Sequence, residues 1–380
     1  MSETIYRDTW VEVDLDAIEY NIKQMKEKLP ADSNIIAVVK ADGYGHGSVQ
    51  VAKKALQAGA KALAVALLEE ALLLREASID VPILVLGRVP PRGALIASEH
   101  DITLTFFQKE WLQEVNTYSF TKNLKLHMKW DTGMGRIGIR TEDELKGTLN
   151  ALNENPNIYL TGVYTHFATA DEKDLTYFYE QKDRFNKFWN VFKELWPHEV
   201  DIHIGNSAAS IRLPNEMKDY IRFGISMYGL YPSNSVKEEK EIDLKQAFSL
   251  HSRFIHVKKL APGESVSYGG TYTAEEEEYI GTIPIGYGDG WIRKLQGISV
   301  LVEGKRMPII GRICMDQTMI RLDREYPVGT HVTLIGEQDN EVIEMDEIAN
   351  YLDTINYEIP CIINHRVPRI YKEHNAYRSK

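Results

Sequence analysis

The chain has 380 residues, of which 43% are hydrophobic and 26% charged, a composition typical of globular proteins and a length that allows two domains. Its formal net charge of −11 argues against binding to nucleic acid or to an anionic membrane, so an anionic ligand must be held by local donors. Because it has only two cysteines, no signal-peptide pattern and no apolar segment long enough to span a bilayer, we expect a cytoplasmic protein.

The first two-thirds of the chain alternates short apolar segments with amphipathic ones. The expected strands are residues 35–40, 62–66, 83–87, 102–106, 124–131, 160–166, 201–204 and 220–225. Eight such strands, each followed by a helix or loop, are typical of a TIM-type (β/α)8 barrel. Residues 174–196 carry an aromatic stripe that predicts a helix packed on this barrel, and Thr141 with Glu144 predicts a capping box.

After about residue 240 the pattern changes to short strands separated by turn residues. The expected strands are 249–260, 279–285, 298–302, 307–312, 318–322 and 331–335, with one helix at 345–352. The sequence therefore predicts a mostly β C-terminal domain. We expect the barrel to comprise residues 12–243, and the β domain to comprise residues 244–380 together with residues 1–11, since chain ends often meet.

Lys40 directly follows the apolar run of residues 35–39 and precedes a glycine-rich segment. In a β/α barrel this position, where a strand opens into a loop, belongs to the catalytic rim. A buried lysine loses its proton easily and becomes a nucleophile, whose usual product is a Schiff base. The alternative is a lysine at a strand end that reaches solvent.

Two stretches on the last two barrel strands suggest a phosphate site. The first runs from His203 through Asn206 to Ser207, and the second contains Gly224 and Ile225. The loops after these strands often bind phosphate in barrels, here through a hydroxyl and backbone N–H groups. A lysine together with a barrel phosphate site indicates pyridoxal phosphate. Taken alone, Ser207 would more often cap a helix and Gly224 would more often serve packing.

Arg222 lies two residues before Gly224, so strand alternation directs both into the barrel. A guanidinium cannot give up its proton, and if it donates to the pyridine nitrogen of the cofactor, that nitrogen stays unprotonated. The ring then withdraws electrons weakly, which favours reprotonation at the same carbon, that is, racemisation. The alternative is an arginine in a barrel salt bridge.

Racemisation needs a second acid/base group opposite Lys40. The β domain offers Tyr268, which precedes two glycines, although a lone tyrosine in a loop is more often structural. Lys129 and Arg136 also lie at the barrel rim. Cys314 is expected to be a packed residue because no histidine lies near it in sequence, and the histidine spacing indicates no metal site.

The sequence resembles the pyridoxal-phosphate-dependent alanine racemases of bacteria over essentially its whole length. The similar stretches, in order, are AVVKADGYGHG, IRFGISMYG, VSYGGTY, PIGYGDGW and GRICMDQ. This resemblance implies an enzyme that interconverts L-alanine and D-alanine with Lys40 and Tyr268 as its two bases and supplies D-alanine for peptidoglycan. It also implies a head-to-tail homodimer in which Tyr268 and Met315 reach into the partner's barrel.

The resemblance further assigns the remaining site residues. Arg222 would meet the pyridine nitrogen, with His166 and His203 beside the cofactor. Arg136 and the backbone of Met315 would orient the substrate carboxylate, and carboxylation of Lys129 would fix Arg136. The other cofactor-binding positions are Tyr44, Asn206, Ser207, Gly224, Ile225 and Tyr357, while Tyr287 would narrow the entrance.

Three other functions remain open from the sequence. A basic amino-acid decarboxylase resembles this architecture, but it usually meets the ring nitrogen with a carboxylate, so Arg222 favours a racemase. A non-catalytic cofactor-binding protein would lack a β domain with a tyrosine such as Tyr268. A racemase for serine or for several amino acids is a further possibility, because a pocket discriminates one methylene by only about 1–3 kcal/mol. The residues also do not separate a biosynthetic role from a catabolic one.

Overall fold

The computed structural model describes residues 6–152 and 154–373. It separates into two compact units that are not contiguous in sequence. The barrel unit comprises Ala17–Gly43 and Ser48–Lys245, and the β unit comprises Met1–Asp16, Tyr44–Gly47 and Gln246–Lys380. The chain therefore passes from one unit to the other at four points.

The barrel unit contains eight parallel strands whose spatial order follows their order in the chain. They are β2 (Asn34–Val38), β3 (Ala62–Val65), β4 (Ile83–Arg88), β5 (Ile102–Phe106), β6 (Leu124–Lys129), β7 (Ile158–Tyr164), β8 (Asp201–His203) and β9 (Tyr220–Phe223). The last strand, β9, pairs with β2, and a bridge between Gly205 and Ile221 joins the ends of the series. The predicted TIM-type barrel and its eight strands are confirmed.

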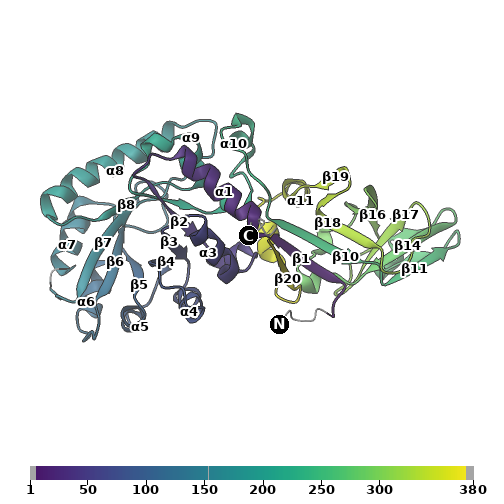
Figure 1. The fold of residues 1–380 in the computed structure, drawn as a ribbon, viewed down its shortest axis with the longest axis horizontal. Coiled ribbons are helices and arrows are strands. Elements are labelled where there is room, and N and C mark those ends of the chain that lie inside the picture. The colour runs from purple at the N-terminus through teal and green to yellow at the C-terminus, as the bar shows by residue number, and fades with distance from the viewer. Residues whose placement is uncertain (1–5, 153, 374–380) are drawn as a thin grey trace, which may run out of the picture. The chain divides into compact units, whose positions relative to one another are not determined.

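Helices cover the outside of this barrel (Figure 1). They are α1 (Leu15–Lys28), α3 (Ser48–Gln57), α4 (Leu68–Glu76), α5 (Gly93–Glu99), α6 (Lys109–Val115), α7 (Glu142–Leu152), α8 (Thr176–Leu195), α9 (Ser207–Arg212) and α10 (Asn234–Glu239). The predicted capping box begins α7, because Thr141 Oγ1 accepts from Glu144 N at 3.2 Å and Glu144 Oε2 accepts from Thr141 N at 3.2 Å. Along the described residues, no helix has the length and apolar character needed to cross a bilayer.

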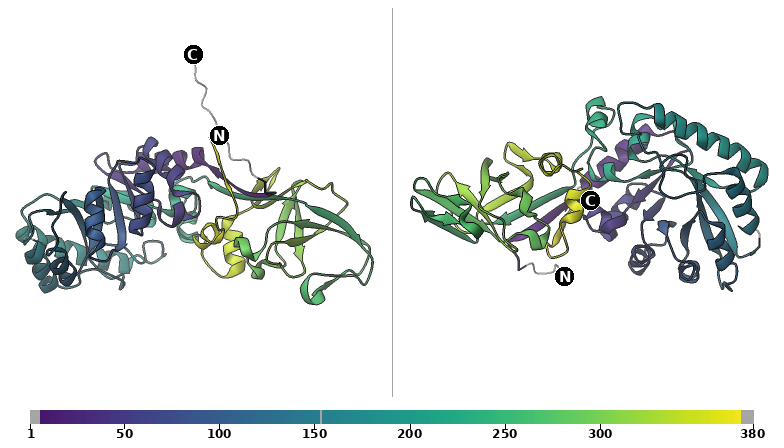
Figure 2. Two further views of the ribbon diagram at one scale, coloured as in Figure 1. Left: turned by 90° about the horizontal axis from the view of Figure 1, so that it is seen from below. Right: turned by 180° about the vertical axis from the view of Figure 1, so that it is seen from behind.

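The aromatic stripe of α8 packs on the barrel as predicted. This long teal helix runs along the outside of the strands (Figure 2). Phe185 and Phe192 are buried, and their rings lie 5.1 and 5.6 Å from the ring of Trp130, measured between centroids. The stripe is therefore part of the hydrophobic core.

The β unit is built on a ten-stranded sheet. Its strands are β1 (Thr9–Asp14), β10 (Phe248–Arg253), β11 (His256–Leu260), β14 (Glu278–Ile283), β15 (Ser299–Val302), β16 (Lys305–Ile310), β17 (Thr318–Leu322), β18 (His331–Gln338), β19 (Glu341–Ile343) and β20 (Arg369–Lys372). A short ribbon is formed by β12 (Ser265–Val266) and β13 (Tyr272–Thr273), and the helices are α11 (Met345–Leu352) and α12 (Glu358–Ile362). The N-terminal strand β1 lies between β10 and β20, antiparallel to the first and parallel to the second (Figure 1).

One predicted strand, residues 249–260, is two strands in the structure. β10 pairs with β1 and β18, whereas β11 pairs with β14. Between them Phe254 N donates to Thr330 O at 3.1 Å and Ile255 N donates to Thr282 O at 2.9 Å, so the chain changes partners there. An apolar pattern cannot show this break because distant strands impose it.

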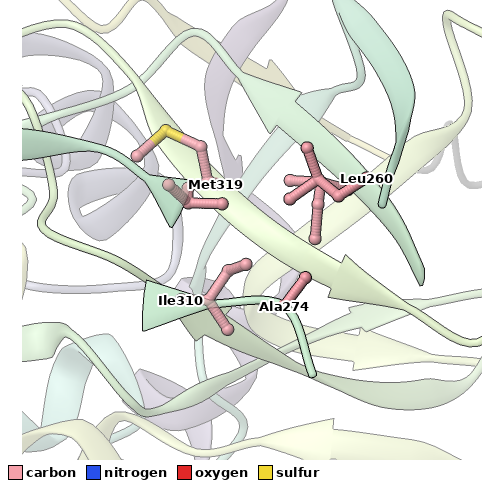
Figure 3. Close-up of a cluster of buried hydrophobic side chains, with 6 residues drawn as sticks. Leu260, Ala274, Ile310 and Met319 are labelled. Atoms are coloured by element: carbon pink, nitrogen blue, oxygen red, sulfur yellow. The ribbon is translucent and has the colours of Figure 1, made fainter. Parts of the chain in front are cut away.

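Under the β11 end of this sheet lies a buried hydrophobic cluster (Figure 3). Its members are Leu260, Val266, Ala274, Ile280, Ile310 and Met319. Cys314 is partly buried and packs against this cluster, and its Sγ lies 3.5 Å from the hydroxyl of Ser267. The prediction that Cys314 is a packed residue is therefore confirmed.

Candidate active site

The barrel gathers five of the predicted residues at one rim, the carboxyl ends of its strands. Lys40 follows β2, Lys129 ends β6, His166 follows β7, His203 ends β8 and Arg222 lies in β9. In this fold the carboxyl ends of the strands form the reactive face. Lys40 and His166 are partly exposed, whereas the side chains of Lys129, His203 and Arg222 are buried.

A left-handed turn follows Lys40. Residues 41–45 all have positive φ, between 51° and 79°, although L-residues pay roughly 1–2 kcal/mol each for this conformation. The turn is held by the backbone N–H of Ala41, which donates to Glu70 Oε1 at 2.6 Å, and by Asp42 Oδ1, which accepts from Ser48 N at 2.8 Å. Such strain persists only where surrounding contacts fix it, so this turn defines where Lys40 leaves the strand.

The guanidinium of Arg222 is almost fully buried among acceptors. Nη1 donates to Nδ1 of His203 at 3.0 Å and to its carbonyl oxygen at 2.5 Å. Nη2 donates to Thr165 O at 2.8 Å and to Nδ1 of His166 at 3.2 Å. Burial lowers the pKa of Arg222 to about 10, so the side chain is still charged at neutral pH. Among the described residues its partners are imidazole nitrogens and carbonyl oxygens rather than a carboxylate, which leaves the salt-bridge alternative without support.

The histidines of this network are neutral. Burial, reinforced by the charge of Arg222, holds the pKa of both His166 and His203 well below its usual value. A third histidine, His127, lies 2.8 Å from His203, measured from Nδ1 to Nε2, and burial lowers its pKa to about 3. Sequence reasoning missed His127, although alternation along β6 places it on the same side as Lys129.

Lys129 is only 3% exposed, and its Nζ lies 4.7 Å from the centre of the Tyr164 ring. Burial and the charges of Arg222 and Arg136 lower its pKa to about 7, against the opposing effect of Asp131. Lys129 is therefore partly uncharged at neutral pH, when an ordinary lysine is fully protonated. Arg136 itself is exposed.

Ser207 and Gly224 meet at the predicted phosphate site. The hydroxyl of Ser207 accepts from the backbone N–H of Gly224 at 3.0 Å, and Ile225 begins a short 3-10 turn. Asn206, not Ser207, caps α9, because its Oδ1 accepts from Ala209 N at 3.0 Å. The alternative that Ser207 caps the helix is thus wrong. Asn206, which is predicted to bind the cofactor, caps the helix instead.

The remaining predicted residues belong to the β unit. The rings of Tyr44 and Tyr357 lie 6.3 Å apart, and burial raises the pKa of the Tyr44 hydroxyl. Tyr268 begins a 3-10 turn and is 68% exposed. Met315 is 53% exposed, and its carbonyl oxygen accepts from Gly288 N at 2.9 Å, next to the exposed Tyr287.

The donor set of the barrel rim fits pyridoxal phosphate. An amine for the aldehyde comes from Lys40, an O–H donor for a phosphate comes from Ser207, and a permanent cation for a ring nitrogen comes from Arg222. The fold and these donors together define a pyridoxal-phosphate enzyme of the class that joins a TIM-type barrel to a β domain.

Comparisons with known proteins identify the family. The model described as alanine racemase, N-terminal domain, matches residues 13–232, and that for the C-terminal domain matches residues 247–371. Alanine racemase of Geobacillus stearothermophilus is 54% identical over 370 residues, covering 97% of this chain and 95% of the relative.

Solved structures agree with the sequence comparison. Alanine racemase from Bacillus anthracis with bound L-Ala-P has a TM-score of 0.95 at 50% identity, covering 97% of this chain and 96% of that one. Histidine racemase from Leuconostoc mesenteroides has a TM-score of 0.88 at 30% identity, covering 97% of this chain and 99% of that one. The chain belongs to the alanine racemases, and it is a pyridoxal-phosphate-dependent isomerase that interconverts L-alanine and D-alanine.

Proposed function

We propose that Lys40 and Tyr268 are the two acid/base groups of this racemase and that they serve opposite faces of the alanine α-carbon. When bound, pyridoxal phosphate withdraws electrons from that carbon and so makes its proton removable. Lys40 takes or returns the proton on one face, and the Tyr268 hydroxyl does so on the other. The rim position of Lys40, fixed by the strained turn after it, supports its role.

The observation that carries the choice of racemisation is the environment of Arg222. Its guanidinium is charged, buried and supplied with neutral acceptors, so it keeps a ring nitrogen that it contacts unprotonated. A decarboxylase of similar architecture would place a carboxylate, and not an arginine, beside the ring nitrogen of the cofactor. Arg222 therefore favours return of the proton to the α-carbon over loss of carbon dioxide or transamination.

The cofactor would be held at its other end by the phosphate donors. Ser207, Gly224 and Ile225 would supply a hydroxyl and backbone N–H groups, with Asn206 beside them. Tyr44 and Tyr357 are the further residues that we propose for binding the phosphate, each through its hydroxyl. His203 and His166 would fix Arg222 beside the ring.

Arg136 and the backbone N–H of Met315 would hold the alanine carboxylate, with Tyr287 narrowing the entrance.

Lys129 would carry a carboxyl group: its uncharged Nζ attacks carbon dioxide, a C–N bond forms, and one N–H proton passes to water. The low pKa of Lys129 supports this step because it supplies the free amine. The resulting negative charge would lie among the cations that lower that pKa, Arg222 and Arg136. A carbamate carbon signal in 13C NMR with labelled bicarbonate, lost in Lys129→Ala, would establish it.

We also propose a homodimer with shared active sites, in which Tyr268 and Met315 act in the partner's barrel. Large side chains this exposed in one chain are typical of surfaces that a partner covers. The domain division that we propose from the sequence is 12–243 for the barrel and 1–11 with 244–380 for the β domain. The compact units of the structure differ from it at residues 12–16 and 44–47, which lie in the β unit, and at residues 244–245, which lie in the barrel unit. The enzyme would act in the cytoplasm and supply D-alanine for peptidoglycan.

Polarimetry tests the assigned residues. The chain loaded with pyridoxal phosphate is given L-alanine or D-alanine in separate runs, with Lys40→Ala and Tyr268→Phe as variants. Rotation that decays to zero from both sides in the wild type, but not in Lys40→Ala, supports the proposal. If the Lys40→Ala enzyme racemises alanine at the wild-type rate, Lys40 is not one of the two acid/base groups.

A second candidate function is a racemase of broader specificity, including serine. It is favoured by one observation, that a structure so similar to this one is a histidine racemase. Measuring kcat/KM for alanine, serine and histidine in parallel separates the two functions, because a dedicated alanine racemase keeps the other two at least about tenfold lower.

A further inference from the structure

We propose that His127 is a positioning residue, which fixes His203 in the tautomer that accepts a hydrogen bond from Arg222. This inference rests on the proposed function, since it concerns how Arg222 is placed for the cofactor ring. His127 itself would touch neither substrate nor cofactor. It acts through a chain of three buried side chains, His127, His203 and Arg222.

The direction of each hydrogen bond in this chain follows from the donors. Arginine only donates, so Nδ1 of His203, 3.0 Å from Nη1 of Arg222, must be the acceptor. A neutral imidazole carries one proton, which then lies on Nε2 of His203. This N–H points to Nδ1 of His127 at 2.8 Å, and Nδ1 of His127 must therefore accept. If Nδ1 of His127 donated instead, Nε2 of His203 would have to accept. The His203 ring would then carry its proton on Nδ1, facing Arg222, or carry no proton at all.

Arg222 and His127 therefore favour the same tautomer of His203, the first as a donor to Nδ1 and the second as an acceptor from the Nε2–H, while the rest of the environment fixes the ring itself. The His203 ring stacks on the ring of Tyr164, with centroids 4.5 Å apart and planes 14° apart, which restricts rotation. The Tyr164 hydroxyl is itself 2.8 Å from that of Thr105. Burial keeps the pKa of both imidazoles low, so neither gains a second proton at neutral pH.

The fold makes room for the ring of His127 in a specific way. Gly162 on β7 lies opposite His127 on β6 in the parallel ladder. A Cβ atom at Gly162 would lie 2.6 Å from both Cε1 and Nε2 of the imidazole and 2.7 Å from Nδ1. A glycine inside a strand weakens the strand, so its presence at position 162 needs a reason. That reason is packing: without a side chain, Gly162 leaves space for the ring of His127.

The experiment uses NMR of the loaded enzyme labelled with 15N in histidine, because 15N shifts separate a protonated ring nitrogen from an unprotonated one. In the wild type His203 is expected as a single species with its proton on Nε2. His127→Phe removes the acceptor, and we expect a mixture of His203 tautomers. His127→Asn places an amide oxygen near the Nδ1 position and should restore the single species.

Racemisation is measured on the same proteins. We expect kcat to fall about tenfold in His127→Phe, the rate equivalent of one lost hydrogen bond, with KM for alanine within twofold, and to recover in His127→Asn. Gly162→Ala, which displaces the ring without removing it, should match His127→Phe and serves if that variant does not fold.

Each outcome has a distinct meaning. A His203 that keeps its proton on Nε2 alone in both His127→Phe and Gly162→Ala overturns the inference. Mixed tautomers with a lower kcat support it. Mixed tautomers with an unchanged kcat still support the link between His127 and His203, but they overturn the role of Arg222 in the proposed function.

Discussion

Lys129 and Arg222 share one aromatic neighbour, the ring of Tyr164. Nζ of Lys129 lies 4.7 Å and Cζ of Arg222 lies 5.3 Å from its centroid. The negative face of an aromatic ring attracts cations, and this attraction offsets part of the repulsion between two buried positive groups. Burial, together with the remaining repulsion from Arg222 and Arg136, lowers the pKa of Lys129 to about 7.

The low pKa of Lys129 predicts how stability depends on pH. Between about 7, its folded pKa, and about 10.5, its unfolded value, the unfolded chain binds more protons than the folded one, so stability rises with pH. Lys129→Met removes this contribution. In buffer free of carbon dioxide, the wild-type unfolding free energy should gain up to about 1.4 kcal/mol per pH unit relative to the variant. If the unfolding free energies of the wild type and of Lys129→Met, measured with urea, change with pH by the same amount, the prediction is wrong.

Arg222→Glu should redirect the reaction. A carboxylate beside the ring nitrogen favours its protonation, the ring then withdraws electrons more strongly, and transamination to pyruvate rises by at least about tenfold relative to racemisation. Pyruvate is measured with a coupled dehydrogenase during turnover of L-alanine. Arg222→Lys, which keeps a cation, is the control and should form no more pyruvate than the wild type. If Arg222→Glu also forms no extra pyruvate, Arg222 does not control the electron demand of the ring.

Complementation tests the shared active site. Lys40→Ala and Tyr268→Phe chains are each inactive, but if Tyr268 acts in the partner's barrel, a mixed dimer keeps one intact site. After dissociation and random reassociation, about half the dimers are mixed and about a quarter of the wild-type activity returns. Each variant put through the same cycle alone is the control. A mixture as inactive as its components would place both residues of a site in one chain.

Asp289 should be essential to the stability of the β unit. It is fully buried and accepts from Arg7 at 2.6 Å and from Gly286 N at 3.1 Å, with Arg366 at 3.4 Å. Asp289→Asn replaces a buried carboxylate by a neutral amide beside the partly exposed Arg7 and the exposed Arg366, and should cost about 2 kcal/mol in chemical denaturation. The matched control is Asp316→Asn, which breaks an exposed pair with Arg366 and should leave the midpoint unchanged. Equal midpoints for the two variants would show that the buried carboxylate contributes little.

The sequence predicts the barrel well because several of its strands, such as β2, β3 and β4, are short apolar runs set by local residues. It predicts the order of the β-unit strands poorly, since both partners of β1, which are β10 and β20, lie far from it in sequence. The break between β10 and β11 is missed for the same reason.

At the site, Lys40 and Arg222 are predictable because a charge at the end of a buried strand needs an explanation. The left-handed turn at Ala41 and Asp42 is not, because their residue types disfavour it and a distant carboxylate, that of Glu70, stabilises it. His127 could have been found from its alternation with Lys129, and Gly162 from its place inside a strand. That the two meet is visible only in the register of β6 and β7.

The position of β1 in the sheet determines when the β unit can finish folding during translation. This strand leaves the ribosome first, yet Val11 pairs with Leu250 on one side and with Arg369 on the other. At roughly 5–20 residues per second, the first of these partners appears about 10–50 s later. Throughout that interval both edges of β1 are open, and the side chains of Val11 and Val13, which end up fully buried, are exposed to solvent or bound by a chaperone. The β unit can therefore finish folding only after translation of nearly the whole chain, long after the last barrel strand has emerged.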